Sequence, residues 1–197
     1  MGWTLVSTTV ATSNPAFIDF TINTDYDEIM FVVTHYRPYT DEQELEWQVK
    51  TSSYGSYNRG IQSNNYNMWQ NRGDGGTAME FYAGSPWWQD SGDAETQAFI
   101  GGEGNGEFHS GTGGNAAQMA GSGELTIYRP QDTTHWKHFD SKMSGVYTGN
   151  GTLAQTNNYP IFTSGYIKEA EALTGIRFKE RGGNGIANGT FSMYGLA

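Results

Sequence analysis

The chain has 197 residues and a formal net charge of −10 at pH 7, with 14% aromatic residues, 27 glycines and no cysteine. This length fits one domain spanning residues 1–197. The acidic balance argues against nucleic acid and membrane surfaces as partners. The lack of cysteine excludes disulfides and thiolate chemistry. The opening residues lack the pattern of a signal peptide, and no apolar run is long enough for a membrane span.

The first quarter of the chain predicts four strands. Apolar and polar residues alternate at 3–8 and 16–22, which is the period of a strand. Residues 28–37, "EIMFVVTHYR", form the most apolar run and predict a central strand that is covered on both faces. Residues 44–52 place Leu45, Trp47 and Val49 on one face and charged or polar residues on the other, which predicts a half-buried strand.

The middle of the chain has a different composition. Residues 53–95 and 101–123 are rich in glycine, asparagine, serine and aromatic residues, and have little sustained periodicity. They predict two long loop insertions, with a short strand at "TQAFIG" between them. The first insertion contains candidates for one or two short elements, at "NYNMWQ" and "AMEFYA".

Strand signals return after residue 122. We predict strands at 123–130, 135–145, 159–170, 175–180 and 189–196, with a possible interruption at Gly165. The last of these is expected to be ordered because it pairs within a sheet. No segment predicts a convincing helix. Nine or ten short strands with turns between them predict an all-β fold, an antiparallel β-sandwich of the jelly-roll type.

Metal-binding and catalytic patterns are weak. His135 and His138 lie three apart on a predicted strand, so they point to opposite faces and do not share an ion. The acidic stretches 25–28 and 40–46 and the turn at 71–76 are compatible with calcium but lack the spacing of an EF-hand loop. No nucleophile-elbow, phosphate-loop or zinc-protease motif occurs. We therefore expect no enzymatic activity, metal or cofactor.

The aromatic residues of the middle region are the candidate contact residues: Tyr66, Trp69, Tyr82, Trp87 and Trp88. They fit anchors at a subunit interface, where tryptophan and tyrosine are enriched. They also fit a platform on which sugar rings stack, or a small satellite core beneath a long loop. The sequence leaves these three interpretations open.

Several stretches resemble virion proteins of tailed bacteriophages, notably marine and cyanobacterial phages. The stretches are "GWTLVSTTVATSNPAFIDFT", "YDEIMFVVTHYRPYTDEQELEWQV", "SGELTIYRPQDTTHWKHFDSKMSG" and "EALTGIRFKERGGNGIANGTFSMYGLA". The resemblance covers residues 1–52 and 122–197 and leaves out the middle.

This resemblance implies a jelly-roll-like virion component. The expected function is a capsid decoration, or cement, protein that stabilises the phage head through subunit contacts. The expected partners are further copies in a homotrimer, and the major capsid protein or other virion proteins. The alternative is a tail-fibre or receptor-binding module that recognises a glycan on the host surface.

Overall fold

The structure is a computed structural model of the chain. It describes residues 2–39, 43–71, 77–80, 98–99, 120–148 and 156–197, and the side chains of 2–39, 43–63, 120–145 and 160–197. These ranges contain no helix, and so none that is long and apolar enough to cross a membrane.

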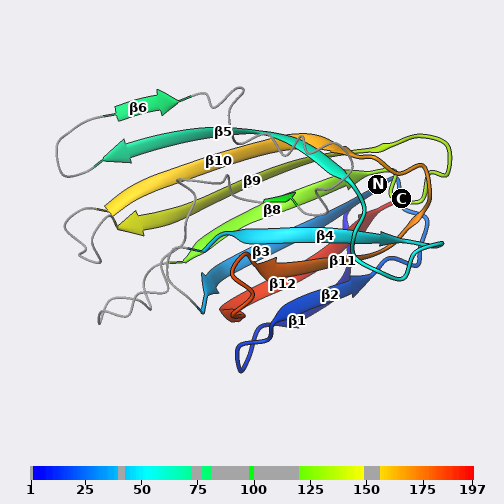
Figure 1. The fold of residues 1–197 in the computed structure, drawn as a ribbon, viewed down its shortest axis with the longest axis horizontal. Helices are drawn as coiled ribbons and strands as arrows, with labels where there is room; N and C mark the ends of the chain where they lie inside the picture. The colour runs from blue at the N-terminus through cyan, green and yellow to red at the C-terminus, as the bar shows by residue number, and fades with distance from the viewer. Residues whose placement is uncertain (1, 40–42, 72–76, 81–97, 100–119, 149–155) are drawn as a thin grey trace.

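Twelve strands occur in the described ranges and form two antiparallel sheets (Figure 1). The large sheet has the order β1-β12-β3-β8-β9-β10-β5-β6, and the small sheet has the order β2-β11-β4-β7. The strands are β1 (Thr4–Val10), β2 (Phe17–Thr21), β3 (Glu28–Pro38), β4 (Leu45–Thr51), β5 (Ile61–Asn71), β6 (Thr77–Glu80), β7 (Ala98–Phe99), β8 (Gly121–Tyr128), β9 (Lys137–Thr148), β10 (Thr156–Ile167), β11 (Leu173–Glu180) and β12 (Ile186–Leu196).

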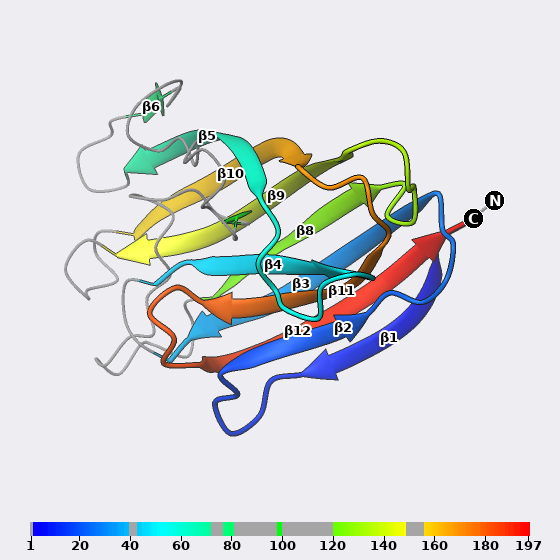
Figure 2. The ribbon, with the colours of Figure 1, turned by 45° about the vertical axis from the view of Figure 1, so that its right-hand side comes forward.

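In both sheets, a strand from the end of the chain lies between two strands from its beginning. β12 lies between β1 and β3, with Thr4 opposite Gly195 and Phe191 opposite Val33. In the small sheet, β11 lies between β2 and β4. The predicted C-terminal strand is therefore confirmed, since β12 is hydrogen-bonded along both of its edges. The two ends of the chain lie beside each other (Figure 2).

The inner faces of the two sheets share one hydrophobic core. Phe31 of β3 meets Phe20 of β2 and Phe178 of β11 edge-on, with ring centroids 5.4 Å and 5.3 Å away. Trp47 of β4 packs against Phe139 of β9 at 4.9 Å. Edge-to-face packing of this kind stabilises a pair by about 0.5–1.5 kcal/mol beyond the area that it buries. The predicted fold class, an all-β antiparallel sandwich, is confirmed.

The prediction for β4 is right on one face and wrong on the other. Trp47 and its apolar neighbours on that face are buried as expected, but Glu44 and Glu46 are buried as well. Basic side chains compensate both carboxylates: Arg181 lies 3.2 Å from Glu44, and Lys179 lies 2.9 Å from Glu46. Burial raises the pKa of Glu46 despite this partner. Strand β4 is therefore covered on both faces at its start, whereas Gln48 and Lys50 further along are partly exposed.

The predicted insertion at 53–95 contains two strands within its described part. β5 includes "NYNMWQ" and is longer than expected, since it extends the large sheet beside β10 for eleven residues. β6 pairs with β5 and covers the start of "AMEFYA". β7 corresponds to the short strand expected at "TQAFIG". Most of the predicted insertion at 101–123 lies outside the described residues.

Candidate binding surfaces

The five aromatic candidates of the middle region lie mostly outside the described part of the structure. The backbones of Tyr66 and Trp69 belong to β5, opposite Phe162 and Ala78 respectively, but their side chains are not described. Tyr82, Trp87 and Trp88 lie wholly outside the described residues. The three interpretations of these aromatic residues stay predictions.

The large sheet presents a patterned outer surface over β8, β9, β10 and the start of β5. In β9, Phe139 and Ser141 are buried while Asp140 and Lys142 are exposed, because side chains alternate along a strand. Cross-strand register places the outward residues of neighbouring strands side by side. We call this surface the outer face; its described outward residues are Gln62, Glu124, Thr126, Tyr128, His138, Asp140, Lys142, Phe162, Ser164 and Tyr166.

Polar contacts fix several side chains of the outer face. The hydroxyl of Tyr128 donates to Asp140 Oδ2 at 2.9 Å, and this bond is the main reason that the pKa of Tyr128 is raised to about 12. Lys142 forms an ion pair with Glu124 at 2.8 Å. These contacts use one oxygen of each carboxylate and leave further acceptor positions at the surface.

Aromatic rings stand beside these polar groups. The indole of Trp136, directly before β9, stacks on the ring of Tyr166 with centroids 5.3 Å apart and planes 12° apart. His138 meets the same tyrosine ring edge-on at 6.3 Å. Trp136 is 53% exposed and Phe162 is 45% exposed, so both offer apolar surface to a ligand.

Two shallow hollows lie across the outer face. One, of about 310 Å³, is lined by His138, Tyr166 and residues between them on neighbouring strands; the other, of about 320 Å³, is lined by Tyr128, Phe162 and their neighbours. Asp140 and Ser164 line both, so the hollows adjoin. Both volumes are at the lower end of the range for small-ligand sites.

Gly165 allows β10 to pass close to β5 at the first hollow. A Cβ at this position would collide with the backbone carbonyl oxygen of Gln62 and approach the Cα of Ser63 to 2.8 Å. The interruption considered at Gly165 does not occur, since β10 continues through it to Ile167. The glycine instead permits a close backbone approach.

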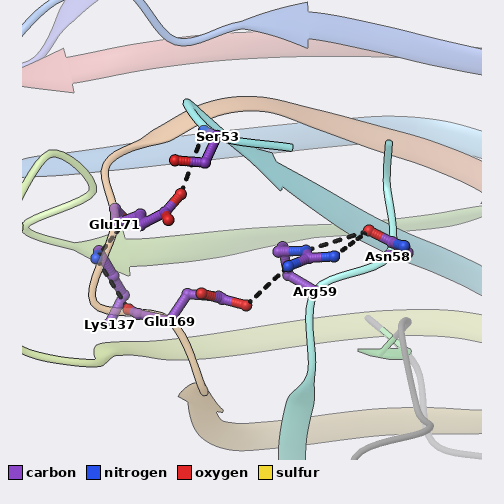
Figure 3. A network of polar contacts seen from close by, with 6 residues as sticks. All are labelled: Ser53, Asn58, Arg59, Lys137, Glu169 and Glu171. Carbon is purple, nitrogen blue, oxygen red and sulfur yellow. Dashed lines mark hydrogen bonds and ion pairs between the residues drawn. The ribbon is translucent and has the colours of Figure 1, made fainter. Parts of the chain in front are cut away.

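Buried Lys137 anchors the strand that carries the outer face. Its ammonium group donates to the carbonyl oxygens of Glu169 and Glu171, at 2.9 Å and 2.6 Å (Figure 3). Burial lowers its pKa. Because Lys137 points inward, its neighbour Trp136 points outward, against Tyr166.

The segment that accepts these bonds is itself tied to the loop before β5. Arg59 lies 3.2 Å from the carboxylate of Glu169 and also donates to the side-chain oxygen of Asn58. The backbone N–H of Ser53 donates to the carboxylate of Glu171 at 3.2 Å (Figure 3). The connection between β10 and β11 is therefore held from two sides.

The turn before Trp136 is ordered by one carboxylate. Asp132 accepts the backbone N–H groups of Thr134 and His135, at 2.6 Å and 3.0 Å, and contacts the ring of His135 at 3.1 Å. These hydrogen bonds, chiefly the one from Thr134, lower the pKa of Asp132. This side-chain turn leads the chain into β9 with a fixed geometry.

A second candidate surface is the edge of the sandwich at β1 and β2, which lie side by side in both views (Figures 1 and 2). β1 is the outermost strand of the large sheet and β2 of the small one. Among the described strands, β1 pairs only with β12. We call this surface the open edge; its large apolar side chains, 40–55% exposed, are Trp3, Leu5, Val10 and Phe17.

The predicted histidine and acidic groups are separated. His135 contacts Asp132, whereas His138 lies on the outer face beside Tyr166. Within the described ranges, no group of three or more histidine, aspartate or glutamate side chains is placed to hold a metal ion. Residues 40–42 and 72–76, part of two stretches considered for calcium, lie outside those ranges.

Comparison of the chain with protein-family models, with curated proteins and with solved structures finds no match. The strand order and the two surfaces therefore carry what can be inferred about function.

Proposed function

We propose that this chain is a non-enzymatic structural protein of a tailed-phage virion, with a capsid decoration role. Its partners would be further copies of itself, in a homotrimer, and the major capsid protein or other virion proteins. The segments that resemble phage virion proteins, 1–52 and 122–197, supply β1–β4 and nearly all of β8–β12. The resemblance therefore falls on most of both sheets.

The strand order supports a jelly roll at the centre of this proposal. Eight strands give the facing sheets β1-β12-β3-β8 and β2-β11-β4-β7. Successive strands of these eight switch between the sheets, except that β4 and β7 share the small sheet, in the nested manner of two Greek keys. In this description, β9, β10, β5 and β6 are additions that widen one sheet. Jelly rolls are common in capsid proteins, although the fold by itself does not define a function.

The open edge is the observation that carries the assembly role. An outer strand with free backbone groups and exposed apolar side chains is a template for pairing with another chain. Leu5 and Val10 point away from the core here, where an isolated monomer would favour charge. The ring of Phe17, by contrast, is partly covered by the guanidinium of Arg177 at 3.6 Å. A neighbouring subunit that covers the open edge would remove this apolar surface from water, at roughly 25 cal/mol per Å².

The acidic composition is consistent with a particle exterior. A net charge of −10 disfavours adsorption of nucleic acid and contact between like-charged particles. We propose no catalysis because each described carboxylate of the outer face already has a protein partner: Glu124 pairs with Lys142, and Asp140 accepts from Tyr128 through one of its oxygens. A polysaccharide-cleaving site needs one carboxyl group as proton donor and another as nucleophile or base.

Two measurements test this proposal. Cryo-electron microscopy of virions that contain the chain should show density repeated across the head, with the open edge covered by a neighbour. Density confined to the tail would favour the receptor-binding alternative instead. In solution, analytical ultracentrifugation should show a trimer that the double variant L5K/V10K shifts to monomer. The matched control Tyr39→Lys, at an equally exposed position, should leave the trimer intact; a monomeric wild type would contradict the proposal.

A further inference from the structure

We propose that the outer face binds a neutral saccharide, with sugar rings on Trp136 and Phe162 and their hydroxyl groups in the two hollows. This site differs from the loop aromatic residues considered from sequence. It does not rest on the decoration role, because a saccharide site is compatible with either location on a virion.

The aromatic groups suit a sugar ring. A pyranose has a face of C–H groups, which packs on the face of an aromatic ring, and an edge of hydroxyl groups, which needs polar partners. Trp136 is fixed in a stack with Tyr166 and is still 53% exposed, so its free face is pre-oriented. Phe162 offers a second exposed ring in the adjoining hollow. Rigid, exposed rings bind at a low cost in conformational entropy.

The polar groups between the rings suit hydroxyl recognition. Asp140 and Ser164 line both hollows, and each can accept from a sugar hydroxyl. The carboxylate of Asp140 is held in place by Tyr128 and keeps acceptor positions free. Gln62, placed by its bond with the hydroxyl of Tyr166, adds an amide that can donate. A hydroxyl both donates and accepts, so this mixture of groups matches it.

The charges of the outer face select for an uncharged ligand. Lys142 and the imidazole of His138 line the hollows, and Lys142 is already paired with Glu124 at 2.8 Å. Asp140 places a negative charge at both hollows, in a chain whose net charge is −10. Sialylated or sulfated sugars and nucleic acid would therefore be repelled. A protein partner is the competing occupant, and it would cover the face in the assembled particle.

The test uses the full chain and named probes. Neutral oligosaccharides of glucose, galactose, mannose and N-acetylglucosamine, with sialylated and sulfated oligosaccharides as anionic probes, are screened on an array. Hits are then titrated by calorimetry. Trp136→Ala and Asp140→Ala are expected to weaken binding at least about tenfold. Trp136→Phe keeps a ring and should retain part of the affinity for the probe. Tyr39→Ala removes an exposed ring elsewhere and should leave the affinity unchanged.

Thermal melting of each variant separates lost binding from lost folding. Binding of a neutral probe that depends on Trp136 and Asp140 in folded variants supports the proposal. It is overturned if the folded wild type binds none of the neutral probes or prefers the anionic ones. It is equally overturned if Trp136→Ala binds as tightly as the wild type, or if another protein covers the outer face in the virion.

Discussion

Lys137→Met is expected to destabilise the protein strongly although it removes a buried charge. Methionine keeps the length of the side chain but cannot donate to the carbonyl oxygens of Glu169 and Glu171. A hydrogen bond to a charged group contributes about 1.5–3 kcal/mol, so two such bonds give a loss of at least about 3 kcal/mol. For a domain of this size, that loss lowers the thermal midpoint by roughly 6–12 °C.

Urea denaturation followed by tryptophan fluorescence measures this loss. Lys142→Met is the matched control on the same strand, since its exposed ion pair with Glu124 should contribute about 1 kcal/mol or less. Replacing a buried ion with an apolar side chain is sometimes neutral or stabilising. If Lys137→Met unfolds at the wild-type urea concentration or above it, the ammonium group does not hold the connection between β10 and β11, and the anchoring role is wrong.

Three further changes probe the core and the outer face. Phe178→Ala removes a fully buried ring from the contact between the sheets, and chemical denaturation should show a loss of about 3–5 kcal/mol; a loss below 1 kcal/mol would contradict the packing. Gly165→Ala places a Cβ against the carbonyl of Gln62, and this overpacking should lower the free energy of unfolding by about 1–3 kcal/mol. The melting temperature should fall accordingly, and an unchanged melting temperature would refute the close approach. Asp140→Asn should return the pKa of Tyr128 from about 12 towards 10. Because the folded pKa is raised, the stabilisation by this bond is present below pH 10 and is lost as the pH rises towards 12. Tyrosinate absorbance in the wild type and the variant measures the difference, and identical titrations would exclude the bond.

The strands that follow simple alternation were predictable from the sequence. The predictions of β3 and of the apolar face of β4 are confirmed because apolar residues, Phe31 and Trp47 among them, recur there at every second position. β5 was less visible, because its polar run "SNNYNMWQN" shows no apolar period. Its pairing with β10 across about a hundred residues determines its structure, and local composition carries little of that information.

The outer face was only partly visible in the sequence. The alternation of Trp136 and His138 with Lys137 and Phe139 is in the chain, but it does not tell which side faces the core. A lysine ordinarily marks the solvent side, whereas here Lys137 is buried and Trp136 is exposed. The carbonyl oxygens that compensate the lysine come from the connection after β10, so that only the folded chain decides the direction.

The position of β12 between β1 and β3 bears on how the chain folds as it is synthesised. β3 ends at Pro38 and β12 begins at Ile186, so about 150 residues separate them. At about 5–20 residues per second, a ribosome makes the second strand roughly 7–30 s after the first. During that interval, β1 and β3 lack the strand that joins them, and their edges are free to pair wrongly. The large sheet can close only after β12 has been synthesised, so we expect that a chain truncated before Ile186 leaves the edges of β1 and β3 unpaired and prone to association.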